Sequence, residues 1–236
     1  AGVGYSTLWS ETFDDPLFLD GLKAWMDTGR VAHPRKHVQP LAHTSVPHPA
    51  AATARQLAEE LRLRKALLGV FDEGCMGMFN AIIPDALLFP AGVFKERRSQ
   101  SALLAAMRRV PDSEARAVYA WLQQRGFTFH FGPDESTDLT ESQVIEQCRM
   151  YIAACRIGDA TGCDAIGIQY QLGLTDCCPA SDLAEGMLNN AERPPVRNEL
   201  GQVIREGKPF THFNEVDECA GLDGLFTQRV HDALGQ

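Results

Sequence analysis

The sequence predicts an α/β fold in which a largely parallel, twisted sheet is flanked by helices. Short apolar runs of strand type alternate along the chain with longer segments of helical periodicity, and this order is typical of a parallel sheet. With 236 residues, 44% of them apolar, the chain is long enough to bury a large core. The alternation covers residues 50–236, which we interpret as one domain. Residues 1–49 lack it and are interpreted as the end of a preceding domain or a linker.

The first part of the chain contains a stretch rich in proline and histidine. The sequence HPRKHVQPLAHTSVPHP at residues 33–49 has no periodicity and is typical of an extended connector. Its four histidines are the residue type of a metal site, but the prolines prevent them from sharing one helical face. A connector is therefore favoured. The chain does not begin with methionine, and we interpret it as an interior segment of a longer protein.

The helices of the second part are predicted from periodicity and from signals at their ends. The clearest spans residues 140–162, where Thr140 and Gln143 have the spacing of a capping box and apolar residues recur at helical intervals. The segment 111–126 begins with proline and acidic residues and ends at a glycine. Further helices are expected at residues 50–64, 99–110, 180–190 and 224–235.

Four strands are expected to lie parallel in one sheet, near residues 66–71, 127–131, 164–169 and 210–214. Each is a short run of strand-forming residues, and FTFHF at 127–131 alternates as a half-buried strand does. The carboxyl ends of parallel strands meet at one edge, where ligands bind in open α/β sheets. Polar clusters follow three of the four strands: DEGCMGM, QYQLGLTD and NEVDE. The sequence therefore predicts a binding site at this edge.

Each polar cluster has a structural and a functional interpretation. DEGCMGM lacks the spacing of phosphate-binding loops and contains two acids that would repel phosphate, so a tight turn is favoured. In QYQLGLTD, the amides of Gln169 and Gln171 suit a hydroxyl-rich ligand as well as they suit the local backbone. In NEVDE, Glu215 and Asp217 are costly at a buried strand end unless they are paired or bind a cation, and hard divalent metals prefer carboxylate oxygen. A solvated loop before a helix is the alternative.

Taken in order, these segments resemble the L-fucose isomerase family, which are metal-dependent aldose–ketose isomerases related to L-arabinose isomerase. The stretch from Leu67 to Glu96 resembles the strand–Met-Gly–helix segment of that family's middle domain, and the resemblance covers about residues 50–236. The remaining motifs are Gln-x-Gln, then Thr-Asp, Pro, Asp and Glu-x-x-Leu-Asn, then Glu-x-Asp-x-x-x-Gly. They fall on Gln169, Gln171, Thr175, Asp176, Pro179, Asp182, Glu185, Leu188, Asn189, Glu215, Asp217 and Gly221.

The resemblance implies a sugar ketol-isomerase, an intramolecular oxidoreductase that acts on a free sugar through a cis-enediol. Glu215 would bind Mn²⁺ or another divalent cation and would be one of two carboxylates that move protons. Gln169 would contact sugar hydroxyls, and Met76 would lie near the substrate of a neighbouring subunit. We expect Asp217 to orient Glu215 or the helix that follows it. The resemblance also implies a homo-oligomer, a hexamer in that family.

Parts of such an active site are not accounted for by this chain. In the family, the second carboxylate and a metal-binding histidine come from sequence beyond the glutamate motif, and fifteen residues follow Gly221 here. We therefore expect that the chain alone lacks a complete active site. The residues around Thr175 differ from the family pattern, so the identity of the sugar does not transfer. Two other functions stay open: a non-catalytic sugar-binding module, and an epimerase or lyase that uses the same fold and metal site.

The composition argues against several classes of partner. The formal net charge is −9 and the basic residues are scattered, which argues against nucleic acid. No apolar run approaches the ~20 residues needed to cross a bilayer, and the first thirty residues lack the basic region of a signal peptide. Seven cysteines without a C-x-x-C pair indicate free thiols in a reducing cytoplasm rather than a disulfide framework.

Overall fold

The structure is a computed structural model that describes residues 4–33, 35, 38–40, 45, 47–72, 79–171 and 173–235. The chain divides into two compact units, residues 1–50 and 51–236, and the division falls within α2 (His48–Arg64). The first unit contains α1 (Pro16–Thr28). Asp15 caps the start of α1 by accepting a hydrogen bond from the Phe18 backbone N–H at 2.9 Å, and a left-handed glycine ends the helix.

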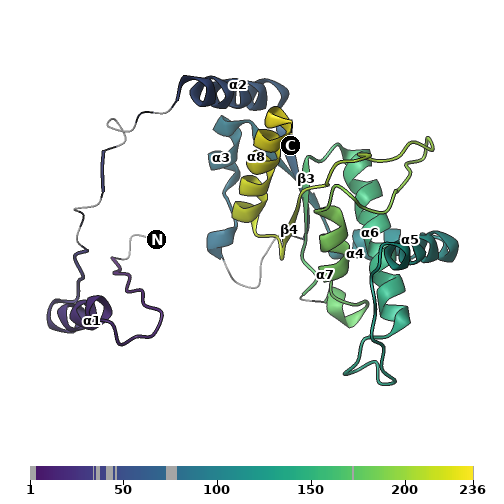
Figure 1. The fold of residues 1–236 in the computed structure, drawn as a ribbon, viewed down its shortest axis with the longest axis horizontal. Helices are drawn as coiled ribbons and strands as arrows, with labels where there is room; N and C mark the ends of the chain where they lie inside the picture. The colour runs from purple at the N-terminus through teal and green to yellow at the C-terminus, as the bar shows by residue number, and fades with distance from the viewer. Residues whose placement is uncertain are drawn as a thin grey trace. The chain divides into compact units, whose positions relative to one another are not determined.

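The second unit has the predicted α/β fold, with a four-stranded parallel sheet flanked by helices (Figure 1). All three pairs of neighbouring strands are parallel, and Ile168 lies opposite Asn214 at the carboxyl ends of the last pair. The strand order across the sheet is β2 (Val93–Arg98), β1 (Ala66–Phe71), β3 (Ala165–Ile168) and β4 (His212–Asn214).

The predicted helices are present, with ends shifted by a few residues. The capping box at the start of the longest helix is confirmed, because Thr140 and Gln143 exchange side-chain to backbone hydrogen bonds. The helix expected at residues 224–235 begins earlier, directly after β4. The helices that follow β1 are α3 (Asp85–Leu88), α4 (Gln100–Met107), α5 (Asp112–Gln124), α6 (Glu141–Thr161), α7 (Asp182–Leu188) and α8 (Glu218–Leu234).

Helices cover both faces of the sheet. On one face, buried residues of α4, α5, α6 and α7 form one core with Phe71, Ile166 and Ile168. On the other, α2, α3 and α8 pack against Leu68 and Val70 (Figure 1). Because both faces are buried, a ligand can reach the sheet at the two ends of its strands, and in open α/β sheets ligands bind at the carboxyl ends.

On the second face, the ring of one residue, Phe213, sets the distance between α8 and the sheet. The ring of Phe213 on β4 lies against Gly167 of β3 and against Gly221 of α8. A Cβ atom added to Gly167 would lie 2.3 Å from the Phe213 ring, and one added to Gly221 would lie 2.6 Å from it. The ring therefore occupies the space that two missing side chains leave, and larger residues at either glycine would push the helix away from the sheet.

One predicted strand is wrong and another was missed. Residues 127–131 lie outside the sheet, and four of these five residues are exposed. The fourth strand is β2, which pairs with β1 along the edge of the sheet. Its sequence VFKERR has four consecutive charged residues, so it lacks the apolar run of a central strand. Charged side chains are common on edge strands, where they prevent unwanted pairing.

Within the described ranges, no helix is both long enough and apolar enough to cross a membrane. The six cysteines in those ranges are all free thiols, in agreement with the expectation from their spacing. These are Cys148, Cys155, Cys163, Cys177, Cys178 and Cys219.

Candidate functional site

The parallel pairing of β3 and β4 brings two predicted site residues to one edge of the sheet. Gln169 directly follows β3, and Glu215 directly follows β4. Because the last residues of these strands lie opposite each other, Gln169 and Glu215 lie at the same edge. Met76, the third residue of the predicted substrate site, falls outside the described residues.

Two glutamines organise the loop after β3. Gln169 is 1% exposed, and its Oε1 accepts a hydrogen bond from the backbone N–H of Gln171 at 3.1 Å. The Gln171 Nε2 in turn donates to Glu215 Oε1 at 2.8 Å. From α4, Gln100 donates to the backbone carbonyls of Gln169 at 2.5 Å and Gln171 at 2.6 Å. Gln171, which the sequence motif contains without a role, is therefore the glutamine that holds the Glu215 carboxylate.

The backbone of Glu215 is held in an unusual conformation. Glu215 and Val216 both have positive φ angles, 51° and 57°, which are rare for residues other than glycine and especially for a β-branched residue. The turn is closed by a hydrogen bond of 2.9 Å from the Asp217 N–H to the Asn214 carbonyl. It aims the Glu215 side chain toward Gln171 instead of continuing the strand.

Asp217 acts on the helix that follows. It is the N-cap of α8, and its carboxylate accepts a hydrogen bond from the Ala220 N–H at 3.0 Å. Of the two roles expected for Asp217, this contact corresponds to orienting the following helix.

A second carboxyl group lies near the same edge, on α7. Glu185 is buried and accepts a hydrogen bond from the Ser181 hydroxyl. Burial raises its pKa to about 7, and the negative charges of Asp182 and Glu215 also raise it, while the Ser181 hydrogen bond opposes the shift. The Glu-x-x-Leu-Asn motif contained Glu185, but nothing in the local sequence shows that it is buried.

His212 lies beside Glu185 and is the most unusual side chain of the region. Its ring is fully buried, and neither ring nitrogen has a hydrogen-bond partner among the described residues. Its Nδ1 lies 3.7 Å from Glu185 Oε2, which is too far for a hydrogen bond. Burial lowers the pKa of His212 to about 3, so the ring is neutral near pH 7. Asn189 fixes its backbone through hydrogen bonds of 2.7 and 3.0 Å.

Two oxygen donors among the described residues are of a kind that would fit a divalent metal ion. Among them, no group of three or more His, Cys, Asp or Glu side chains is placed to hold an ion. The Glu215 carboxylate and the buried Oε1 of Gln171, which has no hydrogen-bond partner in the part of the chain that the structure describes, are oxygen donors of the kind that Mn²⁺ accepts. They fit such an ion as two of its ligands, and the remaining ligands would have to come from outside the described residues.

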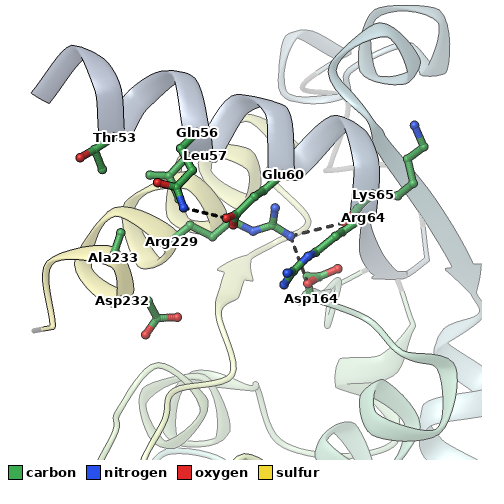
Figure 2. A pocket seen from close by; sticks show the side chains of 10 residues that line it. All are labelled: Thr53, Gln56, Leu57, Glu60, Arg64, Lys65, Asp164, Arg229, Asp232 and Ala233. Carbon is green, nitrogen blue, oxygen red and sulfur yellow. Dashed lines mark hydrogen bonds and ion pairs between the residues drawn. The ribbon is translucent and has the colours of Figure 1, made fainter. Parts of the chain in front are cut away.

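A pocket of about 640 Å³ lies at the opposite edge of the sheet, between α2 and α8 (Figure 2). Lys65 and Asp164 precede β1 and β3, so this is the edge where the strands begin. Arg229 of α8 lies 3.4 Å from Asp164, which also accepts a hydrogen bond from the Leu67 N–H at 2.9 Å. These contacts tie α8 to the start of the sheet, and the pocket is separate from the predicted site.

Comparison with known proteins adds no relative: no protein-family model and no curated protein matches the chain. The functional interpretation therefore rests on the residues and contacts described above.

Proposed function

We propose that the protein is a metal-dependent aldose–ketose isomerase of the L-fucose isomerase type, with its site at the edge where β3 and β4 end. The observation that carries this proposal is the presence of two carboxyl groups with different environments at that edge. Glu215 is half-buried and bonded to Gln171, whereas Glu185 is buried and has a pKa raised to about 7. The order of the sequence motifs supports the same assignment.

The two carboxyl groups suit the proton transfers of this reaction. Converting an aldose to a ketose moves a proton from C2 to C1 and a hydroxyl hydrogen from O2 to O1, through a cis-enediol. The reaction therefore needs one group that accepts a proton and one that can hold or return it. With a pKa of about 7, Glu185 is protonated in a large fraction of molecules near neutral pH. Glu215, which is less buried, is the group that meets the substrate.

The neighbouring side chains suit a sugar. The amides of Gln169 and Gln171 offer donors and acceptors to hydroxyl groups, and the Oε1 of Gln171 has no protein partner among the described residues. When bound at Glu215, Mn²⁺ or another divalent cation would supply positive charge beside the sugar oxygens. Met76 stays in the proposal as a substrate contact, and Asp217 as the residue that fixes α8.

The proposal includes a homo-oligomer, a hexamer by resemblance, and a location in the cytoplasm. The free thiols of the described cysteines support that location, since disulfides are rare in the reducing cytoplasm. The proposal also includes the expectation that this chain alone lacks a complete active site.

The test is an assay of the complete natural polypeptide with Mn²⁺ and a panel of free aldoses, measuring ketose formation. We expect Glu215→Gln to abolish conversion and weaken Mn²⁺ binding in calorimetric titration, with an unchanged melting temperature. The matched control is Glu199→Gln, which changes an exposed carboxylate that is not one of the candidate site residues and should retain both. Binding without conversion would favour a sugar-binding module, and a C2 epimer as product would favour an epimerase. Full activity and metal affinity in Glu215→Gln would rule out this site.

A further inference from the structure

The segment 127–131, FTFHF, has the side-chain pattern of a strand but no strand partner in the described part of the chain. The rings of Phe127, Phe129 and Phe131 stack along one side, with centroids 6.5 and 6.0 Å apart and interplanar angles of 24° and 3°. This spacing is that of residues two apart on one face of a strand. The segment is therefore extended, although it lies outside the sheet.

The aromatic side of this segment is anchored to the molecule at its centre. Phe129 is half-buried, contacts Tyr119 of α5 with a centroid distance of 5.5 Å and packs against the main core. Phe127 and Phe131 remain 51% and 42% exposed. The packing of Phe129 holds the segment in place, while large apolar side chains on either side of it stay in contact with solvent.

The backbone of the segment has no pairing partner among the described residues. Hydrogen bonds of 3.1 Å from Phe127 to Leu122 and from Gly132 to Leu139 close its two ends. Between them, residues 128–131 make no hydrogen bond with any residue that the structure describes. An extended, exposed and apolar edge of this kind readily pairs with another strand, and proteins usually cover such edges. A partner that pairs with this segment would therefore be another extended backbone, with its own row of hydrogen-bond donors and acceptors.

We propose that this segment pairs with the same segment of a second copy of the protein, antiparallel about a two-fold axis at Phe129. The charges at the two ends of the segment select this partner and this direction. Arg125 lies before the segment, and Asp134 and Glu135 lie after it. Antiparallel pairing of two copies places the arginine of each next to the acids of the other, whereas parallel pairing in register places like charges together.

The end charges are available for this contact. Arg125 pairs with Glu192 at 3.0 Å and lies over the Trp121 ring, but the side chains of this ion pair are 53% and 76% exposed. An exposed pair of this kind contributes little to stability. The proposed interface uses none of the residues of the candidate isomerase site, so it stands or falls independently of the proposed function.

The first test measures self-association by sedimentation over a range of concentrations of the chain. We expect a dimer, or a larger oligomer that contains this pair, and we expect Arg125→Glu to weaken the pairing by about tenfold, because two contacts per pair change from attraction to repulsion. Reversing the partner charge as well, in Arg125→Glu with Glu135→Arg, should restore dimerisation. A chain that stays monomeric at all concentrations, or a dimer that is indifferent to both changes, overturns the proposal.

The second test examines register and direction. A two-fold axis at Phe129 places Thr128 of one copy opposite His130 of the other, and both residues are exposed. A mixture of Thr128→Cys and His130→Cys proteins should therefore form a disulfide between these positions under mild oxidation, as mapped by mass spectrometry. Each variant alone should not, because identical positions lie diagonally, too far apart for a disulfide. Equal cross-linking in the single variants, or none in the mixture, contradicts this register.

Discussion

Two buried glutamates in this protein have opposite surroundings. Glu218, at the start of α8, is 0% exposed and accepts hydrogen bonds from Lys95 Nζ at 2.8 and 2.9 Å and from the Ile83 N–H at 2.7 Å. Glu185, on α7, has one hydroxyl donor, from Ser181, and lies beside the neutral ring of His212.

The difference separates a structural acid from a candidate functional one. Around Glu218, a buried cation and a backbone N–H compensate the charge, and Lys95 also donates to the Ile83 carbonyl at 2.9 Å. Around Glu185 no cation of the described residues compensates the charge, so burial instead keeps the carboxyl protonated up to about pH 7. Groups with strongly shifted pKa values cluster at functional sites, and the isomerase proposal therefore places proton transfer beside Glu185 and not beside Glu218.

The largest effect on stability is expected at Glu218, the structural acid of this comparison. Lys95→Met leaves the Glu218 charge buried without its cation, and should lower the free energy of unfolding by about 3–5 kcal/mol in urea titrations. Lys208→Met is the matched control, because Lys208 is exposed and its 3.6 Å pair with Asp232 is on the surface. Adding Glu218→Leu to Lys95→Met should recover much of the loss. A loss below that of the control would show that the pair does not stabilise the fold.

The next effect is a pH dependence caused by Glu185. Its folded-state pKa of about 7 lies above the ordinary value of 4.5, so ionisation is harder in the folded protein. Its contribution to stability is complete below about pH 4.5 and is lost as the pH rises toward and through 7, by on the order of 3 kcal/mol in total. Glu185→Gln should flatten this part of the curve of unfolding free energy against pH. Glu199→Gln should retain the wild-type curve, and a flattening there as well would exclude Glu185 as the cause.

A smaller effect, in the stabilising direction, is expected at His212. Both ring nitrogens are buried without a hydrogen-bond partner in the described ranges, and replacing such a group by an apolar side chain removes the cost of keeping it from water. His212→Leu should raise the free energy of unfolding at pH 7 by about 1–2 kcal/mol while lowering activity, if the ring serves the site. Thermal or urea unfolding measures the first quantity, and a clear destabilisation would mean that the ring has a partner after all.

The smallest effect concerns Asp217. As the N-cap of α8 it should cost about 1 kcal/mol when changed to alanine, whereas Asp217→Asn should cost a few tenths, because asparagine caps a helix nearly as well. Unfolding in urea distinguishes the two. Equal losses for both variants would show that the negative charge matters more than the capping hydrogen bond.

The sequence predicted α2, the helices from α4 to α8 and three of the four strands, because those segments carry their signals locally, whereas α1 and α3 were not predicted. It placed Gln169 and Glu215 together for the same reason, since the ends of parallel strands meet at one edge. The missed strand, β2, forms by pairing with β1, and the charge of its Lys95 can be buried because Glu218, 123 residues later, accepts its hydrogen bonds. The local pattern of the charged residues gives no indication of that contact.

The incorrect strand prediction at residues 127–131 has a related cause. The alternation of FTFHF shows that residues 127–131 fit a strand, but it cannot show whether the sheet has a free edge to receive one. Here the outer strands of the sheet are β2 and β4, and residues 127–131 pair with neither of them. Likewise, the motif containing Glu185 identified the residue but not its pKa, which depends on the burial that α7 acquires by packing against α6.

The contact of Phe213 with Gly167 and Gly221 has an evolutionary consequence. A side chain can be gained at either glycine only if the ring becomes smaller, so the three positions should vary together among relatives of this protein rather than one at a time. The first turn of α8 begins next to Glu215, and a displaced helix would carry the loop with it. Selection on the edge of the sheet should therefore constrain three residues, in β3, β4 and α8, that take no part in any chemistry.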